Sequence, residues 1–297
     1  MKITFLGTGS MVPTSERNHT SILLSYKNEN ILVDCGEGTQ RQLRLAKTST
    51  AKITKILITH WHGDHVLGLP GLLQSMYKNH FQGVLEVYGP KGTKSFFDKM
   101  LKWFYVDLRM NIKVKEVKNG TFFENRDFLL KSIELNHAVP CVGYSFIEED
   151  KRNINKKYLK KFNLKNNPII ARLKEGKDIT WNRKKIKSKN SVVFSKGKKI
   201  SFILDTGLTN NIIKLARDSD ILICESTLSH ELEKKAEEYR HLTAKQAGMI
   251  AKKSRSKELI LTHFSQRYKD VNVLLKEAKS VFKNAKAAED FKEFEIK

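Results

Sequence analysis

One short stretch, ILITHWHGDH at residues 56–65, constrains this chain more than any other part of its sequence. An apolar run of strand length is followed by four potential metal ligands: His60, His62, Asp64 and His65. Imidazole nitrogens and carboxylate oxygens bind zinc and related metals. His60 and His62 stand two residues apart at a strand end, so their side chains point to the same side. Isolated histidines are usually surface or core residues, but a cluster this dense predicts a metal site.

Composition and charge limit the class of protein and the class of partner. A chain of 297 residues with 40% hydrophobic residues and five prolines is globular, with enough material for one large domain or two small ones. It carries 55 Lys or Arg against 32 Asp or Glu, a net charge of +23. Such a charge predicts an anionic partner, nucleic acid first and an anionic membrane surface second. A lysine-rich composition can also reflect a biased genome.

The cysteines and the apolar runs bear on the compartment. Cys35, Cys141 and Cys224 are odd in number and scattered, which gives no disulfide framework and suits a reducing compartment. The apolar run at residues 3–6 is too short for a signal peptide, and no stretch approaches membrane-spanning length. We therefore expect a soluble cytoplasmic protein.

Strand-like and helix-like patterns alternate along both halves of the chain, which predicts an α/β sandwich with helices on its outer faces. We find no internal repeat of fixed period. The predicted strands cover residues 3–6, 21–26, 31–34, 56–58, 85–88, 112–117, 128–135, 142–147, 200–204, 221–224 and 259–261, and the predicted helices cover residues 40–46, 67–77, 93–104, 211–217, 244–253 and 273–282.

A basic segment at residues 151–189 interrupts this alternation. It holds fifteen Lys or Arg and two acidic residues, a net charge of +13. One interpretation is a disordered basic insertion, and the other is a projecting arm that binds phosphates. The apolar side chains of Tyr158, Phe162 and Trp181 favour a small folded knob on a stalk.

Three later residues complete a candidate metal centre. His137, Asp205 and His263 each follow an apolar run directly, which places all three at one edge of the sheet layer. Alone, Asp205 would be no more than a residue that starts a turn. With the first four ligands they make seven, more than one tetrahedral zinc uses, and two metals that share a bridging carboxylate would use them all. The same ligands would admit manganese or iron.

These motifs resemble the ribonuclease Z family of the metallo-β-lactamase superfamily, whose members mature the 3′ end of transfer RNA. The resemblance covers nearly the whole chain. It implies one domain over residues 1–297, an αβ/βα sandwich with a projecting basic substrate-binding arm at about residues 149–190. It also implies precursor tRNA as the partner and a homodimer in which one subunit's arm holds RNA for the other's site. The lack of a membrane-spanning stretch predicts no membrane partner. The motifs are THWHGDH (59–65), PTSERN (13–18), EST (225–227), HLT (241–243) and THFSQRY (262–268).

The resemblance also assigns roles to residues. It places His60, His62, His137 and Asp205 on one zinc ion, and Asp64, His65, Asp205 and His263 on a second. Asp64 would help to activate the attacking water, His241 would act as general acid, and Glu225 would orient His241. The reaction would be attack of a metal-activated hydroxide on a phosphodiester, leaving a 3′-hydroxyl on the tRNA. Two residues depart from the family pattern: Ser15 stands in place of a lysine, and Asn167 in place of a glycine.

Other interpretations remain open at the level of sequence. Judged on its own surroundings, His241 fits a helix-start residue as well as a proton donor, and Phe264 fits the core as well as a base-stacking site. A small-molecule phosphodiesterase or a related hydrolase could use the same metal centre, but it would not require the basic arm. An RNA-binding module with a structural metal site is the third alternative. Structural zinc sites are usually closed, with four ligands and many cysteines, which argues against it.

Overall fold

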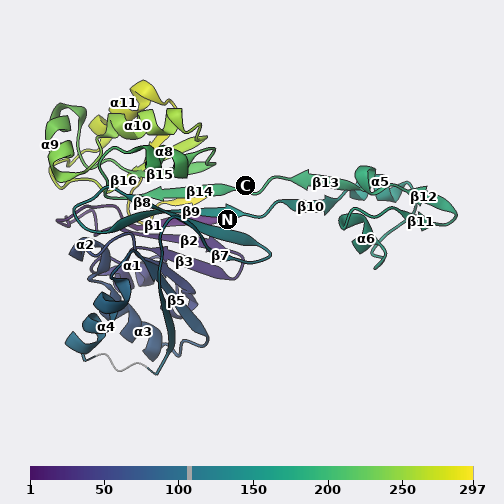
Figure 1. Cartoon of the computed structure of the whole chain (residues 1–297), viewed down its shortest axis with the longest axis horizontal. Helices are drawn as coiled ribbons and strands as arrows, with labels where there is room; N and C mark the ends of the chain where they lie inside the picture. Colours follow the sequence, from purple (N-terminus) through teal and green to yellow (C-terminus); the bar gives the residue numbers. More distant parts are fainter. Residues whose placement is uncertain (106–108, 297) are drawn as a thin grey trace.

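The computed structural model of the chain describes residues 1–105 and 109–296. Two seven-stranded sheets pack face to face, and helices cover their outer faces (Figure 1). The strand orders are β18-β1-β2-β3-β4-β5-β6 in the first sheet and β17-β16-β15-β14-β9-β8-β7 in the second. The predicted α/β sandwich is confirmed.

The first sheet combines an antiparallel hairpin region with a parallel region. Strands β3 to β6 run parallel, so each connection between them crosses over and carries a helix on the outer face. The strands are β1 (Lys2–Gly7), β2 (Ser21–Tyr26), β3 (Glu29–Val33), β4 (Lys55–Leu57), β5 (Val84–Gly89), β6 (Asn111–Glu116) and β18 (Glu293–Glu295). The helices are α1 (Thr39–Leu45), η1 (Thr50–Lys52), α2 (Gly63–Val66), α3 (Leu69–Lys78) and α4 (Thr93–Trp103).

The second sheet is parallel from β14 to β17 and antiparallel from β7 to β9 and between β9 and β14. Its strands are β7 (Gly120–Glu124), β8 (Phe128–Leu135), β9 (Cys141–Glu148), β14 (Lys199–Ile203), β15 (Ile221–Glu225), β16 (Glu258–Thr262) and β17 (Ala285–Ala287). Its helical elements are α8 (Asn210–Ala216), η2 (His230–Leu232), α9 (Glu233–Tyr239), α10 (Ala244–Lys253) and α11 (Asn272–Val281).

Buried side chains form three layers that hold the strands in place. One cluster fills the space between the sheets, and one lies beneath the helices of each outer face. In the central layer, Phe128 and Phe146 stack at 4.8 Å between ring centroids. Each fully buried large apolar side chain contributes about 1.5–3 kcal/mol, so this core fixes the strand ends that carry polar side chains.

The boundaries of the predicted elements agree closely with the structure, but the sequence patterns do not predict β7 or α9. The predicted helix at residues 67–77 begins instead at Leu69, because α2 ends at Val66 and Pro70 occupies the first turn of α3. The edge strands β17 and β18 have three residues each, too few to produce a periodic pattern.

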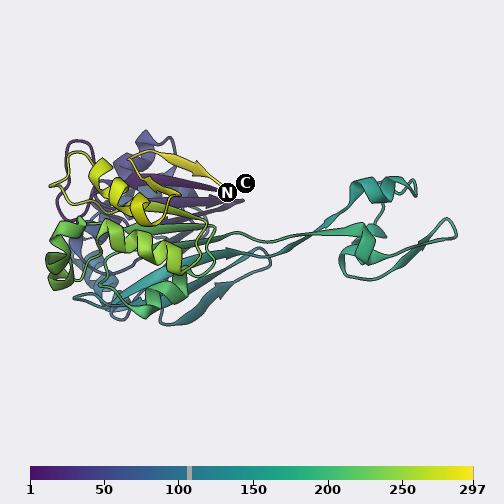
Figure 2. The same ribbon diagram turned by 90° about the horizontal axis from the view of Figure 1, so that it is seen from above.

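Residues 148–198 form a long hairpin that projects from one edge of the sandwich (Figures 1 and 2). Its stalk pairs β10 (Lys151–Ile154) with β13 (Val192–Ser195), and we refer to residues 151–195 as the arm. Beyond the stalk lies a knob with its own core of Leu159, Leu164, Leu173, Ile179 and Ile186. The knob is folded, with elements α5 (Lys156–Lys160), α6 (Ile170–Lys174), β11 (Ile179–Trp181), β12 (Lys184–Ile186) and α7 (Ser188–Ser191).

Within residues 1–105 and 109–296, every helix falls short of the length and apolar character needed to cross a bilayer.

Candidate metal centre and proton donor

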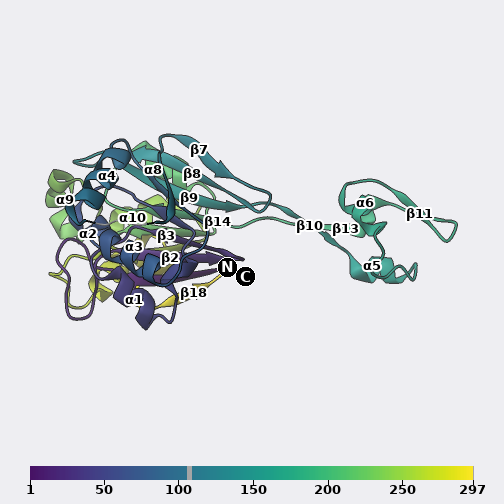
Figure 3. The ribbon, with the colours of Figure 1, turned by 90° about the horizontal axis from the view of Figure 1, so that it is seen from below.

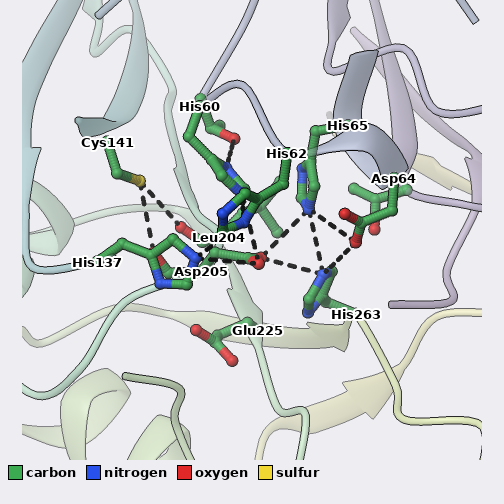
Figure 4. Close-up of polar contacts among 12 residues, drawn as sticks. His60, His62, Asp64, His65, His137, Cys141, Leu204, Asp205, Glu225 and His263 are labelled. Carbon is green, nitrogen blue, oxygen red and sulfur yellow. Dashed lines mark hydrogen bonds and ion pairs between the residues drawn. The ribbon is translucent and has the colours of Figure 1, made fainter. Parts of the chain in front are cut away.

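Seven candidate ligands meet at the edge of the sandwich opposite the arm. His60 and His62 lie in the loop after β4, and Asp64 and His65 lie on the short helix α2 that follows. His137, Asp205 and His263 follow β8, β14 and β16. The carboxyl ends of these strands share one edge, because β8 and β14 both run antiparallel to β9 and because β16 is parallel to β14 through β15. Figure 4 shows these side chains pointing toward one another. The two sheets are joined here by a hydrogen bond of 3.0 Å from Val142 N to Thr59 O.

The seven residues form two groups that share one carboxylate. In each group, the potential ligand atoms lie within 4.8 Å of one another. The first group is His60, His62, His137 and Asp205, and the second is Asp64, His65, Asp205 and His263. These are the same two sets that the family resemblance implies. A shared carboxylate is the arrangement that two adjacent metal ions need.

The contacts inside the centre fit a pair of cations. Ring nitrogens face each other at 3.0 Å between His60 Nε2 and His62 Nδ1, and at 3.2 Å between His65 Nε2 and His263 Nε2. Two neutral imidazoles that aim lone pairs at each other repel unless a cation or a proton lies between them. Asp205 Oδ1 is buried and makes no hydrogen bond, although His263 Nε2 lies 3.0 Å away. These convergent, unsatisfied groups are what a metal centre requires.

In four of the five candidate ligand histidines, the ring nitrogen that points away from the centre has a partner of its own. Such partners fix the orientation of each ring and leave the other nitrogen free for a metal. The pairs are His65 Nδ1 with Asp34 Oδ2 at 2.7 Å, His263 Nδ1 with Thr227 Oγ1 at 3.0 Å, His60 Nδ1 with Thr59 Oγ1 at 3.1 Å, and His137 Nδ1 with Arg240 O at 3.3 Å.

Asp34 is a supporting residue that the sequence analysis assigned only to a strand. Its carboxylate is fully buried and accepts hydrogen bonds of 2.7 Å from both the backbone N–H and the hydroxyl of Thr59, beside His65. Asp34 follows the apolar residues 31–33 directly, the same signal that identified Asp205. Asp34, Asp205 and His263 all have positive φ, at 57°, 45° and 60°. Strained backbone of this kind concentrates at functional sites.

The electrostatics give Asp205, Asp64 and His60 the protonation states that metal binding needs. Burial opposes ionisation of Asp205, but the surrounding His263, His65 and His60 hold its pKa well below the usual range. The pKa of Asp64 is also lowered, because His65 and His263 outweigh the effect of burial. Burial and the neighbouring His65 lower the pKa of His60. Both carboxylates are therefore ionised near neutral pH, and His60 is neutral. At His65 the carboxylates of Asp205, Asp34 and Asp64 outweigh burial and raise the pKa, so a bound metal would have to displace the His65 proton.

Glu225 and His241 form a separate acid–base pair beside the metal ligands. Glu225 ends β15, is fully buried, and lies 3.1 Å from His241 Nδ1 through Oε2. Its carboxylate also accepts hydrogen bonds from Thr206 N and Thr227 Oγ1, both at 2.6 Å. Burial would lower the pKa of His241, but the Glu225 carboxylate outweighs it and raises that pKa to about 9. The His241 side chain is 18% exposed, so a protonated imidazole reaches the opening of the centre.

The His241 ring lies between the two ligand sets. Its centroid is 5.4 Å from that of His137 and 5.7 Å from that of His263. Glu225, His241 and His263 are also close enough to share an ion, but the His241–Glu225 contact already engages one nitrogen of His241.

Two family motifs pack beside the centre. Arg17 donates a hydrogen bond of 2.7 Å from Nη2 to Tyr268 O, which joins the 13–18 loop to the segment that follows His263. Phe264 is 1% exposed and lies in the core beneath the second sheet, so it is a packing residue. Ser15 is exposed on the 13–18 loop.

The chain resembles known proteins over its whole length. A family model described as Anti-Pycsar protein Apyc1 matches residues 1–156, which end at the start of the arm and leave out Asp205, Glu225, His241 and His263. The chain is 40% identical over 298 residues to a ribonuclease Z of Methanothermobacter thermautotrophicus, covering 100% of this chain and 97% of the relative. It is 38% identical over 304 residues to a ribonuclease Z of Bacillus subtilis, covering 100% and 99%.

Solved structures give the same result for the fold. The short form of human tRNase Z superposes with a TM-score of 0.74 at 29% identity, covering 100% of both chains. The metallo-beta-lactamase fold protein YhfI of Bacillus subtilis superposes with a TM-score of 0.71 at 18% identity, covering 99% of this chain and 98% of that one. The match to YhfI concerns the fold alone.

Proposed function

This chain belongs to the ribonuclease Z family and is a metal-dependent endoribonuclease of tRNA 3′ processing, and we propose that two zinc ions per subunit serve its reaction. The observation that carries the proposal is the pair of four-residue groups that share Asp205, with His241 beside them. His60, His62, His137 and Asp205 would hold one ion, and Asp64, His65, Asp205 and His263 the other. When bound, the ions supply Lewis-acid activation of water and neutralise charge on the phosphate.

The protein's own residues would move the protons. Asp64 is buried, and its ionised carboxylate would help to activate the attacking water by accepting a proton from it. His241 holds its proton near neutral pH because its pKa is raised to about 9. It would give that proton from Nε2 to the 3′-oxygen that leaves, while Glu225 holds Nδ1. The products would be a 3′-hydroxyl on the tRNA and a 5′-phosphate on the trailer.

The position of the arm supports a homodimer as the working unit. Strand β14 begins at Lys199, at the base of the arm, and runs away from it toward Asp205. The arm therefore points away from the metal centre of its own chain (Figure 3). We propose that the arm of one subunit holds the folded part of the tRNA while the 3′ end enters the partner's site. The arm's net positive charge suits phosphate contacts.

We also propose that the protein works in the cytoplasm. Its three cysteines, Cys35, Cys141 and Cys224, are buried and unpaired. Burial raises the pKa of the Cys141 thiol, whose S–H lies 3.4 Å from Asp205 O and supports the backbone there. Free thiols persist in a reducing compartment.

A cleavage assay on two substrates tests the proposed function. The purified protein, freed of metal and then supplied with zinc, is incubated with a precursor tRNA and separately with a chromogenic phosphodiester. We expect a single cut at the 3′ end of the tRNA, with the end groups stated above and a far higher kcat/KM for the tRNA. Comparable kcat/KM values for both substrates would favour the small-molecule phosphodiesterase instead.

Mixing two inactive proteins tests the homodimer. One carries Asp205→Ala with an intact arm, and the other has an intact centre but lacks the arm. If each arm serves the partner's site, a mixture that exchanges subunits regains cleavage that neither protein has alone. A mixture that stays inactive while mixed dimers form would refute action between subunits.

A further inference from the structure

One arginine beside the metal centre adopts a backbone conformation that arginine seldom adopts. Arg240 ends helix α9 with φ 55° and ψ 51°, in the left-handed region. The hydrogen bonds of the turn run from Arg240 N to Glu237 O at 3.1 Å and from His241 N to Ala236 O at 2.8 Å. This is a Schellman turn, in which glycine is the usual left-handed residue because it lacks a Cβ. Arginine therefore costs free energy at this position relative to glycine.

The side chain and the main chain of Arg240 both bind His137. The guanidinium Nη1 donates a hydrogen bond of 2.6 Å to His137 O, and Arg240 O lies 3.3 Å from His137 Nδ1. These two contacts join residues that are 103 positions apart in the sequence, and they connect the end of α9 to the loop after β8. Arg240 thus holds both the backbone and the ring of one candidate metal ligand.

The loop that carries His137 is held on its other side by the turn after Asp205. Gly207 N donates to Asn136 O at 2.8 Å, and Asn136 N donates to Thr206 Oγ1 at 3.2 Å. Without the Arg240 guanidinium, only these two hydrogen bonds of Asn136 would position the loop. The residue that follows Arg240 is His241, so the same turn also places the proton donor.

We propose that Arg240 is a positioning residue, which aligns His137 for the metal and His241 for proton transfer at the cost of a strained helix end. This inference rests on the proposed function. Partners of this kind, which touch a metal ligand but not the metal, typically change metal affinity or activity by about 10–100-fold when removed.

The chain contains a matched control. Arg255 follows α10 with φ 57°, in the same type of turn, with Arg255 N bonded to Lys252 O at 3.2 Å and Ser256 N to Ala251 O at 3.0 Å. Its guanidinium pairs with Asp218 at 3.0 Å on the surface, where the Arg255 side chain is 72% exposed. Arg240→Gly and Arg255→Gly therefore make the same backbone change, and only the first removes a contact to the metal centre.

The test compares wild type, Arg240→Gly, Arg240→Lys and Arg255→Gly. We measure thermal unfolding, the chelator concentration that removes half of the bound zinc, and kcat and KM on precursor tRNA. For Arg240→Gly we expect a melting temperature no lower than that of Arg255→Gly. We also expect a fall of about 10–100-fold in kcat and in that chelator concentration, with little change in KM. Arg240→Lys should recover part of both losses, and Arg255→Gly should match wild type.

Two outcomes would overturn the inference. In one, Arg240→Gly matches Arg255→Gly in zinc retention and kcat. In the other, Arg240→Gly melts well below Arg255→Gly with unchanged zinc retention, which would give Arg240 a role in folding only. Zinc retention needs no RNA, so it tests Arg240 separately from the proposed function, which the wild-type cleavage assay tests.

Discussion

The metal-centre edge of the sandwich and the arm at the opposite edge hold their charged side chains in different ways. At the metal centre, Asp34, His65 and Glu225 are fully buried, and each has a partner in hydrogen-bonding distance. In the arm, most lysines are exposed around a core of five buried apolar residues. The first region is built on the ends of strands that pack inside two seven-stranded sheets, and the second on a stalk of two four-residue strands.

This difference separates catalysis from substrate capture. Chemistry needs reacting groups held to within a fraction of an ångström, which buried and fully bonded side chains provide. Phosphate attraction acts over a Debye length of about 8 Å at physiological salt and tolerates motion. Changes at the centre should therefore affect every substrate, whereas changes in the arm should affect only folded RNA.

The largest effect is expected from Asp205→Ala, which removes the carboxylate common to both groups. We expect kcat to fall on the order of 10⁴-fold for precursor tRNA and for a small phosphodiester alike, because metal activation is worth several kcal/mol and 1.4 kcal/mol is tenfold. Single-turnover assays measure this loss. Asp220→Asn, at the other end of the same sheet, is the control and should stay active. If kcat fell only for precursor tRNA and not for the small phosphodiester, the separation of catalysis from substrate capture would be refuted.

Removal of the arm comes next. Residues 151–195 are replaced by Asn-Gly between Asp150 and Lys196. This keeps the two hydrogen bonds at the base of the arm, from Glu148 N to Lys198 O and from Gly197 N to Asp150 Oδ1. We expect kcat/KM for precursor tRNA to fall about 10²–10⁴-fold, because a linked second contact raises effective affinity by that factor. Turnover of the small phosphodiester should be unchanged, and equal loss on both substrates would refute the assignment of the arm.

The sequence predicts these two regions unequally well. His60 and His62 are predicted as ligands from their close clustering at a strand end, and His137 and His263 because each follows an apolar run, since the sheet brings such positions to one edge. Asp34 has the same signal but belongs to the supporting contacts, which become visible only when His65 and Thr59 are placed beside it. The contact between Arg240 and His137 joins residues 103 apart and depends on a left-handed helix end, which no local pattern indicates. In the arm, charge and aromatic residues predicted a knob but not its strand pairing.

A smaller effect, with a distinct pH signature, is expected from Glu225→Gln. The amide keeps an acceptor for Thr206 N but removes the charge that raises the pKa of His241 to about 9. The proton donor must be protonated, so wild-type activity falls as pH rises through that pKa. In the variant, burial lowers the pKa of His241, and the fall in activity moves to lower pH. At pH 8 we expect the activity of Glu225→Gln to be about 10–100-fold below that of wild type, and we expect this difference to become smaller at pH 6. Parallel pH–rate profiles would refute the acid role.

The smallest effect on tRNA cleavage should come from Leu173→Ala. This substitution tests whether the function of the arm depends on its folded shape or only on its charge. Leu173 is fully buried in the knob, and truncation of a buried leucine costs about 2–5 kcal/mol. A core of five residues has little stability to lose, so the knob should open locally while the sandwich stays folded, as trypsin cleavage confined to the arm would report. Leu274→Ala, on the buried face of α11, should instead lower the melting temperature of the sandwich.

Because the lysines remain on the opened knob, we expect the salt dependence of tRNA binding to persist in Leu173→Ala. The value of kcat/KM should fall only a few-fold, far less than when the arm is removed, because phosphate attraction does not require a fixed shape. Titration of tRNA binding at several salt concentrations measures both quantities. A loss as large as that of the arm deletion would mean that capture, like catalysis, depends on preorganised geometry, and the contrast between the two regions would then lie only in their position.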